Sequence, residues 1–217
     1  MSVTLVVFDL DGTLIDSLGD IGDAVNEVLV RLGLPTHPRD TYRYLVGDGL
    51  EILVRRALPP ESLEDTDVAE VVSLVRREYS TRWTATTRPF PGIPRLLASL
   101  RSRGIESAVL SNKPDFATRG IVDELFADHV FAIVRGALDG VPLKPDTSSV
   151  LHIVSGLGRT PRQSIFVGDT AVDMATGTNA GMRSVGVSWG FREARELVNA
   201  GADHIIGSPL ELLDLLD

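Results

Sequence analysis

Two kinds of hydrophobic pattern alternate along most of the chain. Short apolar runs rich in β-branched residues are followed by segments in which apolar residues recur at helical spacing. This alternation predicts parallel βα units, in which each helix returns the chain to the start of the next strand. The expected strands are 4–8, 106–110, 130–133, 164–167, 184–187 and 204–206. The expected helices of these units are 93–103, 116–125, 148–155, 171–180, 192–199 and 210–215.

The stretch 17–88 breaks this alternation, because it contains no convincing strand. Its apolar spacing predicts helices over 21–32, 42–58 and 68–83. Prolines interrupt the stretch and mark the return of the chain near residue 89. We therefore expect a catalytic core domain of residues 1–16 and 89–217, with residues 17–88 inserted as a helical cap domain on two hinge segments.

The expected fold is α/β, a doubly wound, Rossmann-like parallel sheet of strand order 3-2-1-4-5 with the inserted cap. In this order strands 2 and 4 flank strand 1. Their C-terminal ends share a crevice at the point where the winding direction changes, which is where open α/β sheets bind ligands. Side chains that follow these three strands are therefore the candidates for a functional site.

The first strand is followed directly by Asp9-Leu10-Asp11-Gly12-Thr13. Side chains alternate in an extended segment, so Asp9 and Asp11 point the same way while Leu10 points back. Two adjacent carboxylates are unfavourable unless a cation neutralises them or one carries a proton. The first state suits a metal ligand and nucleophile, and the second suits a general acid. A strand-to-helix turn also uses Asp, Gly and Thr, but the position behind a β-branched run favours a functional role.

Two further clusters contain the only lysines of the chain, two among 21 basic residues. Ser111-Asn112-Lys113 follows the second strand, where a hydroxyl and backbone N–H groups can hold an anion, although Ser and Asn are also common helix caps. Lys144 precedes Pro145, which suits the first position of a helix. Capping does not explain the lysine, whose compact ammonium supplies a point charge that a planar guanidinium does not replace.

The fourth strand leads into Gly168, Asp169 and Asp173. Asp169 and Asp173 are four residues apart and thus neighbours at the start of a helix, where capping alone would favour acidic residues. The functional interpretation is that both carboxylates face the first pair. Four converging carboxylates need a cation, and oxygen ligands without Cys or His nearby select Mg²⁺ over zinc. The predicted metal ligands are Asp9, Asp11, Asp169 and Asp173.

These four motifs, in this order and spacing, resemble the haloacid dehalogenase superfamily over nearly the whole chain, and the helical insertion is similar to that superfamily's cap. Segments 14–17, 46–50 and 189–192 resemble its phosphoglycolate phosphatase group. The resemblance implies hydrolysis of a small phosphorylated metabolite such as phosphoglycolate. Asp9 would attack phosphorus to form an aspartyl-phosphate, and Asp11 would protonate the leaving alkoxide and then activate water.

The resemblance also implies the positions of metal and substrate. Mg²⁺ would bind the Asp9 carboxylate, the Asp11 main-chain carbonyl and Asp169, with Asp173 either a ligand or a neighbour of one. Lys113 would orient its neighbours. The implied catalytic residues are Asp9, Asp11, Ser111 and Lys144. The implied substrate-binding residues are Gly12, Thr13, Ser111, Asn112 and Lys144, with Gly47, Asp48 and Gly49 from the cap, where Arg43 and Arg55 are further candidates.

Several alternatives share these motifs. A dehalogenase is disfavoured because such relatives lack the second Asp, and a cap-lysine phosphonate hydrolase is excluded because residues 17–88 contain no lysine. β-Phosphoglucomutase-type phosphoryl transfer and pyrophosphate hydrolysis stay open. The mutase has a basic residue three positions after the cap-loop glycine, whereas this chain has Leu50 there, which favours hydrolysis. The non-enzymatic alternative is a phosphorylatable binding module.

Composition excludes several classes of functional site and binding partner. The absence of cysteine excludes disulfides, a thiolate nucleophile and a cysteine zinc site. A net charge of −9 argues against a nucleic-acid surface. We also expect no membrane partner, because no apolar run approaches the length of a membrane span and no signal segment is visible. The expected protein is a cytoplasmic enzyme whose partner is a small anionic phosphate ester; the sequence does not distinguish a monomer from a homodimer.

Overall fold

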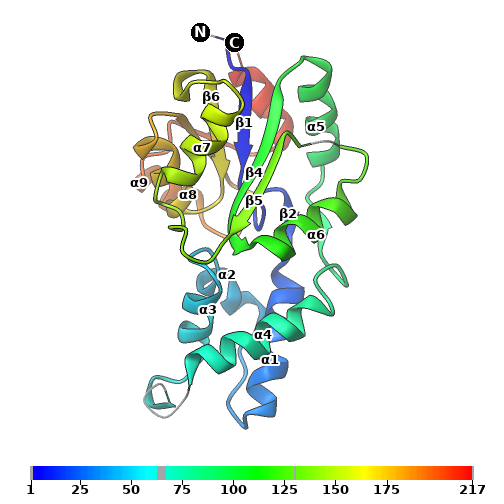
Figure 1. Ribbon diagram of the computed structural model, residues 1–217, viewed down its shortest axis with the longest axis vertical. Helices are drawn as coiled ribbons and strands as arrows, with labels where there is room; N and C mark the ends of the chain where they lie inside the picture. The colour runs from blue at the N-terminus through cyan, green and yellow to red at the C-terminus, as the bar shows by residue number, and fades with distance from the viewer. Residues whose placement is uncertain (1, 63–66, 130, 217) are drawn as a thin grey trace.

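The computed structural model describes residues 2–62, 67–129 and 131–216, and within them a six-stranded parallel sheet forms the centre of the core (Figure 1). The strand order is β5-β4-β1-β6-β7-β8. Numbered by their order in the chain, these strands run 3-2-1-4-5 with β8 added at the edge, so the predicted doubly wound topology is confirmed. The strands are β1 (Leu5–Phe8), β4 (Glu106–Pro114), β5 (Ile133–Ala137), β6 (Ser164–Gly168), β7 (Arg183–Val187) and β8 (His204–Ile206).

Helices cover both faces of this sheet, and β1 shows how the sequence produces the two layers. All four residues of β1 are buried, and alternate side chains enter different clusters. Val6 and Phe8 belong to the larger apolar cluster, whereas Leu5 and Val7 pack in the smaller one. A strand buried on both faces reads as a continuous apolar run, as this one does. The covering helices are α5 (Ile93–Ser102), α6 (Asp115–Leu125), α7 (Ser148–Gly156), α8 (Ala171–Asn179) and α9 (Ala194–Asn199), with short 3₁₀ helices η3 (Pro161–Gln163) and η4 (Pro209–Leu215).

A second group of helices lies beyond the carboxyl ends of the strands, at the bottom of Figure 1. It comprises α1 (Leu18–Arg31), η1 (Arg39–Thr41), α2 (Tyr42–Leu45), α3 (Leu50–Ala57), η2 (Pro60–Ser62) and α4 (Val68–Ser80). Helix α1 buries Ala24, Val25 and Val28 on one face, which is the face predicted from helical spacing. We refer to this group, α1 through α4, as the cap.

A two-stranded sheet joins the cap to the core and was not predicted. Strand β2 (Ile15–Asp16) pairs antiparallel with β3 (Arg88–Pro89). Next to it, the buried Asp20 of α1 accepts hydrogen bonds from the backbone N–H groups and hydroxyls of Thr86 and Thr87 at 2.6–3.0 Å. These contacts bind the outgoing and returning chain segments to each other.

Several predicted elements differ from the structure. The single helix predicted over 42–58 is wrong, because Gly47 (φ 116°) and Gly49 (φ 94°) adopt conformations that break a helix. Val130 of the predicted third strand lies outside the described residues, and the strand itself is β5, Ile133–Ala137. Helix α7 begins at Ser148, so Pro145 is not its first residue. None of the helices in the described residues combines the length and hydropathy needed to cross a membrane.

Candidate active site

The carboxylates predicted at the end of β1 lie where the neighbouring strands also end. The Asp9 N–H donates to Val167 O of β6 at 2.9 Å, so the chain still follows the sheet at this residue. Leu10 is fully buried in the core, while Asp9 and Asp11 both line one cavity. The alternation predicted from the extended backbone therefore holds.

Three carboxylates form the centre of the site. Asp9, Asp169 and Asp173 each present one oxygen, and these three oxygens lie within 4.8 Å of one another. Asp9 is 7% exposed and the other two are 0% exposed, so water does little to separate their charges. The Asp11 side chain is not part of this cluster, so three carboxylates converge here rather than the four predicted. The main-chain carbonyl of Asp11, which the resemblance assigned to the metal, stays a predicted ligand.

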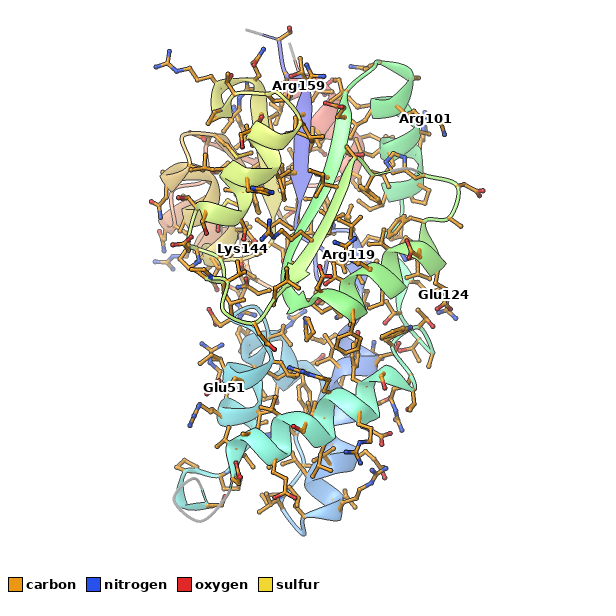
Figure 2. The ribbon with its side chains drawn as sticks, viewed as in Figure 1. Glu51, Arg101, Arg119, Glu124, Lys144 and Arg159 are labelled. Carbon is orange, nitrogen blue, oxygen red and sulfur yellow. The ribbon has the colours of Figure 1, made fainter. Side chains whose placement is uncertain are left out.

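Lys144 supplies the positive charge of the cluster. Its Nζ lies 2.7 Å from Asp9 Oδ1 and 2.7 Å from Asp173 Oδ1, and its side chain is 2% exposed. Figure 2 labels Lys144 at the end of the core that faces the cap. The pKa of Lys144 is raised: burial alone would lower it, but Asp173 and Asp9 outweigh that effect. The ammonium therefore stays charged, and one positive charge faces three carboxylates.

The remaining negative charge perturbs two of the acids. The pKa of Asp9 is raised to about 6, chiefly by burial and also by the charge of Asp173, although Lys144 acts to lower it. Burial, Asp173 and Asp9 together raise the pKa of Asp169 well above its ordinary value. Asp9 Oδ1 is also buried without a hydrogen bond of good geometry, despite its ion pair. An all-oxygen, electron-rich cluster of this kind fits a hard divalent cation such as Mg²⁺.

Close backbone approach holds Asp169 in place. The Phe191 N–H donates to Asp169 Oδ2 at 2.7 Å, and Thr13 Oγ1 lies 3.4 Å from Asp169 Oδ1. A Cβ placed on Gly12 or Gly190 would collide with the Asp169 side chain. Gly12 and Thr13, predicted to bind substrate, therefore contact this carboxylate directly.

Asp173 both caps helix α8 and belongs to the charged cluster. Its Oδ2 accepts from Thr170 N–H at 3.0 Å and Thr170 Oγ1 at 2.7 Å, which forms a capping box at the start of α8. Its Oδ1 pairs with Lys144. Gly168 lies directly against it, where a Cβ would overlap the Asp173 side chain. The capping explanation is thus correct, and the same carboxylate still belongs to the charged cluster.

Asp11 has a separate cation. Lys113 Nζ lies 2.7 and 2.8 Å from the two carboxylate oxygens, and Ser17 Oγ donates to Oδ1 at 2.5 Å. Burial lowers the pKa of Lys113, but Asp11 more than compensates and the net pKa is raised. The ring of Tyr79, from cap helix α4, covers this ammonium at 4.7 Å. The orienting role implied for Lys113 is consistent with this geometry.

Asn112 and Arg192 link the core to the cap loop between α2 and α3. Asn112 Nδ2 donates to Gly47 O and to Lys144 O, each at 3.1 Å, and its Oδ1 accepts from Lys144 N–H at 2.9 Å. Arg192 donates to Val46 O at 3.0 Å. The Asn112 side chain therefore positions two loops, while the neighbouring Ser111 lines the cavity.

The cavity itself is about 70 Å³ and lies between the core carboxylates and the cap. Gly47 and Gly49 line it, as predicted for the cap loop, together with apolar side chains of α1, α3 and α4. Asp48 is not part of the lining and forms an ion pair with Arg56 at 2.6 Å. Arg55 pairs with Glu51 at 2.9 Å and Arg43 also lies outside the lining, so neither faces the cavity.

Sequence reasoning did not identify several contributors to the site. The Ser17 hydroxyl, the Phe191 N–H and the Tyr79 ring each touch a charged group of the core. Arg76 also lines the cavity from α4. Ser17 and Phe191 occur in segments already noted for family resemblance, but their individual contacts depend on packing between distant parts of the chain.

Comparisons with known proteins agree with this geometry. The family model described as haloacid dehalogenase-like hydrolase matches residues 6–187. A phosphoglycolate phosphatase of Pseudomonas putida is 35% identical over 198 residues, 89% of this chain and 72% of that protein. A phosphoglycolate phosphatase of Aquifex aeolicus is 33% identical over 213 residues, 98% of this chain and 96% of that one. The structure of a haloacid dehalogenase-like family hydrolase from Streptococcus pneumoniae is 28% identical, with a TM-score of 0.86 over 99% of each chain. The chain therefore belongs to the haloacid dehalogenase-like hydrolase family.

Proposed function

We propose that this chain hydrolyses the phosphate ester of a small metabolite, phosphoglycolate or a close analogue, with Mg²⁺ and through an aspartyl-phosphate on Asp9. The phosphatase class follows from the family and from the named relatives. The observation that carries the metal and the intermediate is the cluster of three buried carboxylates beyond the end of β1, two of which pair with Lys144.

Asp9 is the nucleophile in this proposal. It belongs to the metal-binding cluster and also lines the cavity, so one of its oxygens can face a phosphorus atom. Attack forms an Oδ–P bond and breaks the bond from phosphorus to the ester oxygen, and the electron pair leaves with that oxygen. Water then cleaves the aspartyl-phosphate, which regenerates the carboxylate.

Asp11 is the proton donor and acceptor. Its carboxyl group lines the same cavity as Asp9 and is held by Lys113 and Ser17. In the first step it gives a proton to the leaving alkoxide, and in the second it accepts a proton from the attacking water. General acid–base assistance of this kind contributes about 10²–10⁴-fold to a rate.

The negative charge of the phosphoryl group needs compensation in this acidic site. Asp9, Asp169 and Asp173 would hold Mg²⁺, which when bound offsets charge on the phosphoryl oxygens. Lys144 neutralises Asp9 and lies next to the position of the transferred group. The Ser111 hydroxyl lines the cavity and can donate to a phosphoryl oxygen.

The cap favours a monoesterase over a mutase. Leu50 lines the cavity at the position where a mutase would have a basic residue, so the cap loop itself offers no cation to a second phosphate.

The test compares phosphate monoesters, a bisphosphorylated sugar and pyrophosphate by kcat/KM, each with and without Mg²⁺. We expect Mg²⁺-dependent release of inorganic phosphate, fastest with phosphoglycolate. An Asp11→Asn variant, quenched in acid during turnover, should carry the mass of one phosphoryl group on the Asp9 peptide. Asp9→Asn is the control and should neither turn over nor become labelled. Phosphoryl transfer between sugar positions would support the mutase instead, and labelling without turnover in the wild type would support a binding module.

A further inference from the structure

Cap helix α4 contributes one cation to the substrate cavity. Val75, Arg76 and Tyr79 all line the cavity, and Tyr79 follows Val75 by four residues and Arg76 by three, so it is a neighbour of both on the helix surface. The adjacent Arg77 is not part of the lining. The lining residues contain two cations, Lys113 from the core and Arg76 from the cap.

These two cations are not equally available to a ligand. Both oxygens of Asp11 occupy the Lys113 ammonium at 2.7 and 2.8 Å. Arg76 has no ion pair or side-chain hydrogen bond with any of the described residues, although its neighbours on the cap, Arg55 and Arg56, each pair with an acid. The guanidinium of Arg76 is therefore the lining cation free to bind an anionic group.

The geometry of phosphoryl transfer directs the leaving group toward this arginine. The attacking and departing oxygens lie roughly in line through phosphorus. Asp9 attacks from the core side of the cavity, so the leaving group extends toward the cap. There the walls are mainly apolar side chains, among them Ile21, Leu53 and Val75. Next to apolar walls, a bidentate, charge-assisted hydrogen-bonded pair between a guanidinium and a carboxylate is stronger than in water.

We propose that Arg76 is the specificity-determining residue of the cap and binds a carboxylate on the leaving group, so that the preferred substrates are short phosphorylated hydroxy acids. This inference rests on the proposed phosphatase function. The cavity has a volume of about 70 Å³, which suits a leaving group of a few non-hydrogen atoms better than a sugar or nucleoside.

The test uses two substrates that differ in one group. Phosphoglycolate carries a carboxylate, and the phosphate monoester of ethylene glycol has a hydroxymethyl group in its place. The ratio of their kcat/KM values is measured for the wild type, Arg76→Leu, Arg76→Lys and the matched control Arg77→Leu. Arg77 lies on the same helix, has the same charge and is absent from the cavity lining.

We expect Arg76→Leu to lower the preference for the carboxylate substrate by roughly 10²-fold, mainly through KM, because the carboxylate of the leaving group loses its ion-pair partner. Arg76→Lys should recover part of that preference, and Arg77→Leu should keep the wild-type ratio. An equal loss on both substrates, or a wild type that prefers the neutral ester, would overturn the inference while leaving phosphatase activity established. A wild type that cleaves neither ester with Mg²⁺ would instead contradict the proposed function.

Discussion

Replacing Lys144 with methionine tests the charge balance of the site. The substitution keeps most of the side-chain volume and removes the ammonium that lies 2.7 Å from both Asp9 and Asp173. Three carboxylates, with oxygens within 4.8 Å of one another, then remain without a cation. Breaking a buried ion pair by removing one partner typically costs about 3–5 kcal/mol. We expect Lys144→Met to lower the free energy of unfolding by about that amount at neutral pH in the presence of chelator.

Urea unfolding monitored by circular dichroism measures this loss. Arg119→Met is the control, because Arg119 is 56% exposed in its pair with Asp115 and such pairs contribute below about 1 kcal/mol. Mg²⁺ should reduce the deficit of Lys144→Met by neutralising the same carboxylates. Acidification should also reduce it, since the pKa of Asp9 is already raised to about 6 with the lysine present, and protonation removes the repulsion. A loss as small as that of Arg119→Met, unaffected by Mg²⁺ or pH, would refute this reasoning.

Three other substitutions test separate parts of the structure. Lys144→Arg should keep the charge yet reduce kcat strongly in the Mg²⁺-dependent assay. The Lys144 side chain is 2% exposed, and a planar guanidinium does not fit in the space of its ammonium. Near-normal turnover would argue against a specific role for lysine. Gly190→Ala should weaken Mg²⁺ activation, because the new methyl group meets the Asp169 side chain and lies 2.5 Å from Gly12 O; unchanged Mg²⁺ dependence would show that the loop shifts without consequence. Asp20→Asn should destabilise the protein by about 2–3 kcal/mol near pH 7 in urea unfolding. Burial acts to raise the pKa of Asp20, but the hydrogen bonds from Thr86 and Thr87 outweigh burial and the net pKa is lowered. This stabilisation is therefore present above the unfolded pKa of about 4 and is lost as pH falls through the lower folded pKa; a difference that does not change with pH would contradict this.

The parts of the site that could be predicted from sequence are those fixed by the ends of strands. A buried, β-branched strand followed by Asp9 and Asp11 determines both the location and the direction of these side chains. The same reasoning placed Asp169 beside them, because parallel neighbouring strands end at one edge of a sheet. Backbone periodicity and topology were sufficient for these positions.

Contacts that depend on packing between distant segments were not predictable in the same way. The two-residue strands β2 and β3 carry no periodic signal, and their pairing joins residues far apart in the chain. The Asp11 carboxylate pairs with Lys113, and strand alternation does not determine the side-chain conformation that makes this contact. Arg76 lines the cavity because α4 packs against α1 and α3 beside the site. The break between α2 and α3 did have a sequence signal, since Gly47 and Gly49 lie within the loop.

The central claim is that the carboxylates of Asp9, Asp169 and Asp173 bind a divalent cation on which ester hydrolysis depends. The most direct measurement is the rate of phosphate release from phosphoglycolate after treatment with EDTA, followed by titration with Mg²⁺, for the wild type and for Asp169→Asn. We predict that chelation abolishes turnover, that Mg²⁺ restores it along a saturable curve, and that Asp169→Asn requires a much higher Mg²⁺ concentration. Turnover that persists in EDTA, or an identical Mg²⁺ curve for the two proteins, would contradict the account.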